Sequence, residues 1–261
     1  MKVVLFCGGL GTRLREHSDI IPKPLVNIGP RPIIWHLMRY YAHYGHKDFI
    51  VCLGYRGDSI RDYFINYDHY LMGDVTLDGS KGIVLPEQSE IADWKITFVD
   101  TGLHSNVGQR LLRVRKYLED EPMFLANYSD QLSDLPLNSY VSEFEKTDAA
   151  VGLLSVKPSS QSYHCVNLDE DGHVNSLELI SESDYWINGG YFVMRNDVFD
   201  YINEGEDMVE EPFIRMAADR KLWSKRYSGF WKAMDTFKDK ITYDRMWGSE
   251  DIPWFVWKDE Q

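Results

Sequence analysis

The chain has 261 residues, of which 44% are hydrophobic, and its 41 acidic and 28 basic side chains give a formal net charge of −13. The acidity argues against a nucleic-acid partner, because phosphate backbones are held by dense Lys and Arg patches, and three scattered cysteines predict neither a disulfide framework nor a zinc site. The sequence contains no run of about 18 apolar residues, which a membrane-spanning helix would need. The first residues resemble a strand and not a signal peptide, so we expect a cytoplasmic protein without a membrane partner.

The first half of the chain alternates strand and helix patterns. The expected strands cover residues 3–8, 49–55, 96–101 and 124–130, and the expected helices cover 32–44, 58–67 and 108–118. This repetition predicts an α/β fold, a Rossmann-like three-layer sandwich with a mainly parallel central sheet, whose ligands bind at the carboxyl ends of the strands. Residues 74–93 are rich in turns and charge, and we expect an inserted hairpin arm or an oligomer contact there.

The second half of the chain predicts shorter strands and several helices. Strands are expected over 150–156, 165–168, 174–180 and 187–194, part of which should form a smaller second sheet, and helices over 135–146, 197–203, 210–221 and 236–247. The aromatic tail at 254–257 is expected to pack back on the body. Because no low-complexity linker or repeat is visible, we expect a single domain over 1–261, with halves of about 1–134 and 135–261.

The first expected strand ends in a glycine-rich turn that is followed by cations. The residues concerned are Gly8, Gly9, Gly11, Thr12, Arg13 and Lys23. Glycines let the backbone approach a ligand closely, and the exposed N–H groups of such a turn favour phosphate oxygens. The turn is neither a Walker loop nor a dinucleotide fingerprint, because Thr12 and Leu14 stand where those motifs need lysine and glycine. It predicts a nucleoside-triphosphate site, with a plain strand-to-turn connection as the alternative interpretation.

Two aspartates from distant segments form a second candidate group. Asp130 ends an apolar strand, and Asp235 precedes Thr236 at the start of an expected helix. Two carboxylates can hold one Mg²⁺, a hard cation that keeps room for water and substrate phosphates. A helix N-cap is the alternative interpretation of Asp235. The eight histidines have no ligand-like spacing, so we expect no histidine metal site.

Seven stretches, in their order and spacing, carry a resemblance that spans nearly the whole chain. They are Gly8–Leu14, Pro22–Val26, Pro32–His36, Val99–Gly102, Gly108–Leu111, Ile187–Phe192 and Gly229–Thr236. The chain resembles the sugar-1-phosphate nucleotidyltransferase family, most closely its glucose-1-phosphate cytidylyltransferase branch. The resemblance implies a nucleotidyltransferase fold, a homo-oligomer, and Mg²⁺-dependent transfer of a cytidylyl group from CTP to a sugar 1-phosphate, with pyrophosphate released and no covalent enzyme intermediate.

The resemblance also implies a role for each matching residue. The catalytic cations would be Arg13 at the leaving pyrophosphate and Lys23 at the α-phosphate, and the metal ligands would be Asp130 and Asp235. The nucleotide would contact Gly8, Gly9, Gly11, Thr12, Arg13, Gly102, Arg110 and Ser129. The sugar phosphate would contact Lys23, Gln131, His164, Asn188, Gly189 and Trp231. A solvated helix residue is the alternative interpretation of Arg110, and an ordinary strand or loop residue that of His164.

The chain departs from the family pattern at two places. Gln131 stands where relatives commonly carry glycine, and we expect it to change the choice of sugar. Leu179 stands where relatives carry a lysine that binds the sugar phosphate, and losing such a charged hydrogen bond weakens binding about tenfold to a hundredfold unless another group replaces it. The replacement candidates are His164, Lys157 and Lys232. Another nucleotide or sugar phosphate, and a catalytically silent nucleotide-binding regulatory protein, are the alternative functions.

Overall fold

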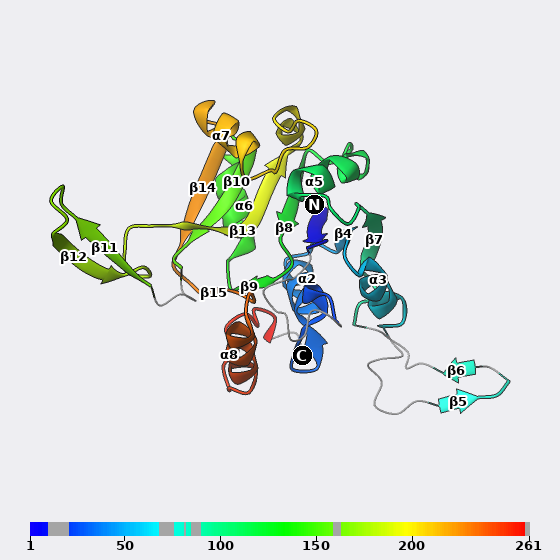
Figure 1. Ribbon diagram of the computed structural model, residues 1–261. Coiled ribbons are helices and arrows are strands. Elements are labelled where there is room, and N and C mark those ends of the chain that lie inside the picture. Colours follow the sequence, from blue (N-terminus) through cyan, green and yellow to red (C-terminus); the bar gives the residue numbers. More distant parts are fainter. Residues whose placement is uncertain (10–20, 68–75, 81, 85–89, 159–162, 259–261) are drawn as a thin grey trace.

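The computed structural model describes residues 1–9, 21–67, 76–80, 82–84, 90–158 and 163–258 (Figure 1). Its centre is a seven-stranded sheet. In spatial order the strands are β14 (Leu222–Tyr227), β10 (Val151–Val156), β13 (Ile187–Arg195), β8 (Met123–Asn127), β1 (Val3–Cys7), β4 (Asp48–Leu53) and β7 (Lys95–Asp100). All neighbours pair in parallel except β13, which is antiparallel to both β10 and β8. Strands from both halves of the chain therefore share one mainly parallel sheet.

Helices cover both faces of this sheet, and the sheet separates the hydrophobic core into two clusters. They are α2 (Ile33–His43), α3 (Gly57–Ile65), α5 (Val107–Val114), α6 (Leu137–Glu145), α7 (Glu211–Ala218) and α8 (Phe237–Trp247), with 3-10 helices at Lys23–Leu25, Arg115–Tyr117 and Asn196–Asp200. Val3 and Leu5 of β1 face the core under α2 and α6, whereas Val4 and Phe6 face the core under α5 and α7. Successive strand side chains point to opposite faces, so this strand is apolar throughout. The predicted three-layer α/β fold is confirmed.

Several short elements differ from the expectation. The segment expected as a helix over 197–203 is the 3-10 helix Asn196–Asp200, and β14, β9 (Gln131–Ser133) and β15 (Trp231–Ala233) were not predicted. The strands β2 (Asn27–Ile28) and β3 (Arg31–Pro32) form a small antiparallel pair. Of the four strands expected in the second half, β10 and β13 join the central sheet. The other two, β11 (His164–Leu168) and β12 (Val174–Leu179), form a separate ribbon that stands away from the sheet (Figure 1).

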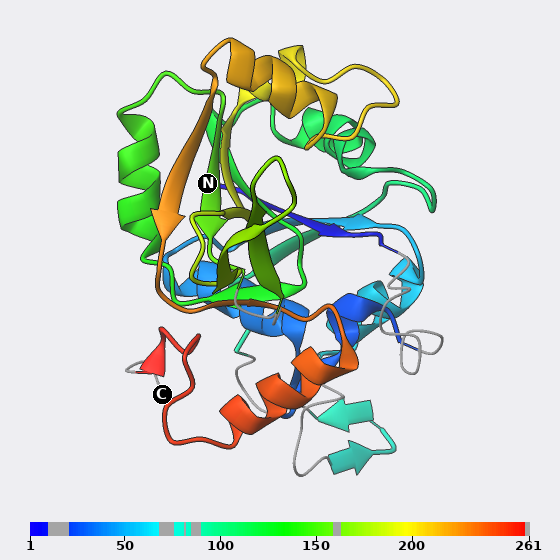
Figure 2. The same ribbon diagram turned by 60° about the vertical axis from the view of Figure 1, so that its left-hand side comes forward.

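Two peripheral segments agree with the sequence analysis. Within 74–93, β5 (Thr76–Asp78) and β6 (Gly82–Val84) form the expected hairpin arm, which extends from the body (Figure 1). The aromatic tail packs on α2 as expected: Trp254 and Trp257 are almost fully buried, and Trp254 lies edge-on to His36. Helices α7 and α8 lie at opposite sides of the molecule in both views (Figure 2). Across the described residues, none of the helices has the length and apolarity that a membrane crossing requires.

Candidate functional site

The pairing of β9 with β15 brings the two predicted metal ligands together. Gln131 lies opposite Ala233 in this antiparallel ladder, and the N–H of Met234 donates to the carbonyl of Asp130 at 2.8 Å. Asp130 directly precedes β9, and Asp235 follows the end of β15 by two residues, so both lie at the same end of this ladder. The two carboxylates lie side by side at the carboxyl end of β8, where ligands bind in an open α/β sheet.

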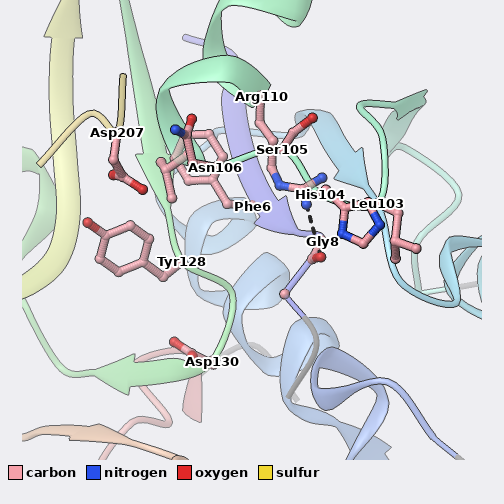
Figure 3. Close-up of a pocket in the computed structure, with 12 residues that line it drawn as sticks. Phe6, Gly8, Leu103, His104, Ser105, Asn106, Arg110, Tyr128, Asp130 and Asp207 are labelled. Carbon is pink, nitrogen blue, oxygen red and sulfur yellow. Dashed lines mark hydrogen bonds between the residues drawn. The ribbon is translucent and has the colours of Figure 1, made fainter. Parts of the chain in front are cut away.

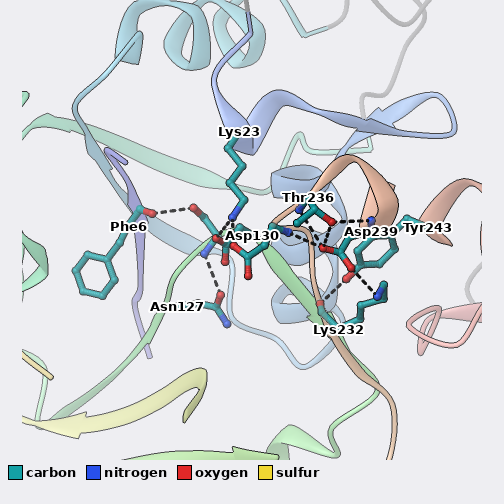
Figure 4. A network of polar contacts seen from close by, with 10 residues as sticks. Phe6, Lys23, Asn127, Asp130, Lys232, Thr236, Asp239 and Tyr243 are labelled. Atoms are coloured by element: carbon teal, nitrogen blue, oxygen red, sulfur yellow. Dashed lines mark hydrogen bonds and ion pairs between the residues drawn. The ribbon is translucent and has the colours of Figure 1, made fainter. Parts of the chain in front are cut away.

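Lys23 joins both aspartates. Its ammonium donates to Asp130 Oδ2 at 2.6 Å and to Asp235 Oδ1 at 2.8 Å (Figure 4). Burial lowers the pKa of Lys23, but the two carboxylates outweigh burial and raise it, so the ammonium stays charged. The pKa of Asp130 is raised, because burial together with the negative charge of Asp235 outweighs the opposing effect of Lys23. The structure thus brings together three residues that the sequence analysis assigned to one site.

The start of α8 positions Asp235. The N-cap of this helix is Thr236, whose side chain accepts from the N–H of Asp239 in a capping box, so the alternative interpretation of Asp235 as the cap is wrong. Asp239 accepts hydrogen bonds from the N–H groups of Asp235 and Thr236, at 3.2 and 2.9 Å. It also pairs with the ammonium of Lys232 at 2.9 Å. Burial raises the pKa of Asp239, but the bonds from Lys232 and Thr236 outweigh it and lower the pKa.

Sequence analysis missed Asp239, although the spacing of Thr236 and Asp239 is that of a capping box. We expect Asp239→Ala to lower the free energy of unfolding by about 3 kcal/mol, because it leaves the buried Lys232 ammonium without its carboxylate. The change also releases the Asp235 backbone, so kcat should fall about tenfold. Chemical denaturation and steady-state kinetics measure both effects.

The matched control is Asp244→Ala on the same helix, whose carboxylate pairs with Lys240 at the surface. Exposed pairs contribute about 1 kcal/mol or less, so this variant should stay close to the parent in both measurements. Equal stability of the Asp239 and Asp244 variants would contradict a supporting role for Asp239.

A pocket of ≈ 450 Å³ opens beside Asp130 (Figure 3). It lies at the carboxyl ends of β1 and β8 and against the start of α5. Its lining comprises Phe6, Gly8, Gly9, Leu103, His104, Ser105, Asn106, Val107, Arg110, Tyr128, Asp130 and Asp207. This volume lies in the range of small-molecule sites. The stretch from Leu103 to Val107, Tyr128 and Asp207 were not predicted from the sequence. The first two follow the ends of β7 and β8, and Asp207 precedes α7, which is the signal that could have identified them.

Arg110 is not the solvated helix residue of the alternative interpretation. Only 4% of it is exposed, and its guanidinium donates to the carbonyl of Gly8 at 3.0 Å, to the carbonyl of Leu53 at 3.1 Å and to Thr101 Oγ1 at 2.6 Å. A Cβ on Gly8 would lie 2.0 Å from Arg110 Cζ, so the packing requires glycine there. Arg110 ties three neighbouring strand ends together and walls the pocket. Its contact with a nucleotide remains a prediction.

The other predicted nucleotide contacts fall into two groups. Ser129 has a left-handed φ of 66° and its hydroxyl donates to the carbonyl of Phe6 at 2.8 Å, which links the end of β8 to β1. Gly102, with φ of 84°, turns the chain before α5, and its N–H donates to Asp100 Oδ1 at 2.9 Å. In the structure both residues form hydrogen bonds that fix the local backbone conformation. Contact with a nucleotide remains a prediction for each. Gly11, Thr12 and Arg13 lie outside the described residues.

Of three predicted sugar contacts, Asn188 bonds to a residue that lines the pocket, and Gly189, which follows it in the sequence, bonds to Trp231. Asn188 Nδ2 donates to the hydroxyl of Tyr128 at 3.2 Å, and Trp231 Nε1 donates to the carbonyl of Gly189 at 2.8 Å. These bonds join the start of β13 to the pocket on one side and to β15 on the other. Asn188 is exposed, so its carboxamide is accessible to a ligand.

The remaining sugar-side predictions have different surroundings. Gln131 is only 3% exposed and packs against Gly190, where a Cβ would lie 1.9 Å from its Nε2. That Nε2 has no hydrogen-bond partner among the described residues. His164 is exposed at the start of the ribbon β11–β12. Lys232 forms a buried ion pair with Asp239. The effect of Gln131 on sugar choice stays a prediction.

The comparison with known proteins decides the family. A family model of nucleotidyl transferases matches residues 2–259. The chain belongs to the nucleotidyl transferase family. The resemblance inferred from the sequence motifs is thereby confirmed.

Individual relatives align with nearly the full length of this nucleotidyl transferase. A probable glucose-1-phosphate cytidylyltransferase of Bacillus subtilis is 39% identical over 98% of this chain and 100% of the relative. A glucose-1-phosphate cytidylyltransferase of Salmonella typhi is 36% identical over 99% of this chain and 100% of the relative. A solved structure of a putative glucose-1-phosphate thymidylyltransferase from Bacillus anthracis has a TM-score of 0.68 at 15% identity, and 96% of each chain is covered. This last likeness concerns the fold.

Proposed function

We propose that the protein transfers a cytidylyl group from CTP to glucose 1-phosphate, giving CDP-glucose and pyrophosphate. Two relatives that carry the cytidylyltransferase name align with the chain over their full lengths. The observation that carries the proposal is the convergence of Lys23, Asp130 and Asp235 at the edge of a pocket large enough for a nucleotide. A retained cation and two retained carboxylates argue against a catalytically silent regulatory protein.

We propose Mg²⁺ as the cofactor, held by Asp130 and Asp235. Both carboxylates already reach one cationic atom, Lys23 Nζ, so their oxygens can converge on a single ion. The described residues contain no cluster of three or more potential ligands from His, Cys, Asp and Glu. Mg²⁺ needs no such cluster, because it is commonly bound through one or two carboxylates with water and substrate phosphates as the other ligands. When bound, the ion would neutralise phosphate charge.

In the proposed reaction, an oxygen of the sugar phosphate attacks the α-phosphorus of CTP, and the bond to the leaving pyrophosphate breaks. The protein contributes alignment and positive charge, since phosphoryl chemistry depends on both. Lys23 stays protonated and sits on a flexible side chain, so its ammonium can move from the carboxylates to the phosphate oxygens. Asn188 and Gly189 border the place for the sugar, and Arg13 would face the pyrophosphate.

The experiment that tests the function is pyrophosphate release from glucose 1-phosphate with CTP, UTP, dTTP, GTP or ATP in turn. We expect release with CTP, and its loss when Mg²⁺ is chelated. Release with another nucleotide alone would move the assignment to another branch of the family. Nucleotide binding without any release would support the regulatory alternative.

We also propose that the protein forms a homo-oligomer in the cytoplasm. The hairpin arm β5–β6 extends from the body and is the candidate contact between subunits (Figure 1). Sedimentation of the chain with and without residues 76–84 measures this contact directly.

A further inference from the structure

Two cations lie over one indole ring, that of Trp186, at the edge of the central sheet. Lys157 Nζ lies 4.6 Å from the ring centroid of Trp186, and Arg226 Cζ lies 5.4 Å from it. Within the part of the chain that the structure describes, neither cation forms an ion pair with a carboxylate, and the guanidinium of Arg226 makes no hydrogen bond. Two like charges on one ring repel each other, and an anion between them would relieve that repulsion.

The strand register places this cluster beside the predicted sugar contacts. Ser155 of β10 lies opposite Asn188 of β13 on one side and opposite Arg226 of β14 on the other. Side chains of paired residues share a face of the sheet, and two strand spacings separate the Cα atoms of Asn188 and Arg226 by about 10 Å. Lys157 directly follows β10 and Trp186 directly precedes β13, and the contacts of the Trp186 ring with Lys157 and Arg226 place them beside this row.

This face is continuous with the nucleotide-sized pocket. Asn188 bonds to Tyr128, and Tyr128 lines the pocket beside Asp130. The cationic cluster therefore extends the candidate active site along the carboxyl edge of the sheet, from β8 across β13 to β10 and β14.

Lys157 also reaches the turn that lacks the family lysine. Its ammonium donates to the carbonyl of Ser183. The N–H of Ser183 donates to the carbonyl of Leu179 at 3.1 Å, and its hydroxyl donates to the carbonyl of Ile180 at 2.7 Å. Leu179 is the residue that stands at the position of that lysine. A cation that follows the end of β10 is thus held against the same turn.

We propose that Lys157 and Arg226, supported by the ring of Trp186, form an anion subsite that binds the phosphate group of the sugar 1-phosphate. The inference rests on the proposed function and adds the residues that replace the missing lysine. A guanidinium offers two parallel donors to one phosphate, and an ammonium adds a mobile point charge. Together they supply the charge-assisted hydrogen bonds that Leu179 cannot make.

The test is calorimetric titration of glucose 1-phosphate into the protein with Mg²⁺ and a non-hydrolysable CTP analogue. We expect Lys157→Met and Arg226→Gln each to raise the Kd for glucose 1-phosphate about tenfold or more, the effect of losing a charged hydrogen bond. The KM for CTP should change less than twofold. Arg226→Lys, which keeps the charge but not the two parallel donors, should show an intermediate Kd. Methyl glucoside, which lacks the phosphate, should bind the parent and both variants equally.

The matched control is Lys225→Met. Lys225 precedes Arg226 on β14, and so points to the other face, where it pairs with Glu143. This variant should bind glucose 1-phosphate like the parent. Unchanged binding by the Lys157 and Arg226 variants, or an equal rise in the constants for CTP and glucose 1-phosphate, would overturn the subsite alone. Failure of the parent to bind glucose 1-phosphate would overturn the proposed function and the subsite with it.

Discussion

Lys23→Met is expected to lower kcat about a thousandfold, the upper range for removing a preorganised charge from a transition state. The same change should strengthen Mg²⁺ binding, because the ammonium at 2.6 and 2.8 Å from the two aspartates no longer competes for their oxygens. Thermal unfolding should change little when Mg²⁺ is present, since the ion replaces the lost positive charge. Steady-state kinetics over a Mg²⁺ titration measures the rate and the metal requirement together.

A control for Lys23 is Lys221→Met, a lysine that pairs with Asp148 at the far end of β14. It removes the same charge from the protein without touching the site, so kcat should stay within about twofold. If the Lys23 and Lys221 variants lost similar amounts of activity, Lys23 would not be a catalytic residue.

The long elements of this fold follow from local patterns, and the short ones do not. Strands β1, β4 and β8 are buried on both faces, so their apolar runs are visible in the sequence. The sequence Ser224-Lys225-Arg226 reads as a loop, yet it belongs to β14, because an edge strand can leave polar side chains in solvent. Strands β9 and β15 have three residues each, too few to show a period.

The sequence predicts that Lys23, Asp130 and Asp235 belong together, but it does not predict how they are arranged. The sequence identifies Lys23, Asp130 and Asp235, but the contact among them depends on the β9–β15 ladder, a pairing between distant segments. Arg110 shows the opposite case. Its place on a helix left a solvated side chain open as the alternative interpretation, whereas a long guanidinium can reach back to carbonyls at strand ends and become buried. Local patterns do not encode such long-range hydrogen bonds.

Asp130→Asn is expected to lower kcat by about a hundredfold or more and to raise the Mg²⁺ concentration needed for half-maximal rate at least tenfold. The substitution keeps the shape of the side chain but removes the charge that the cation requires. Because burial raises the pKa of Asp130, a proton competes with the metal at higher pH than at an ordinary aspartate. Activity of the parent should therefore fall as pH drops toward that pKa, and added Mg²⁺ should restore part of it.

The matched control for the metal site is Asp207→Asn. Asp207 lines the same pocket as Asp130, but only Asp130 and Asp235 form ion pairs with Lys23 among the described residues. Asp207→Asn removes the same charge from the pocket as Asp130→Asn does. The Mg²⁺ requirement of this variant should therefore stay that of the parent, even if the KM for CTP changes. A normal Mg²⁺ dependence in the Asp130 variant would mean that the ion is held elsewhere. In that case the contacts of Lys23 with the two aspartates would only stabilise the fold. Protonation of Asp130 would then not explain a loss of activity at low pH.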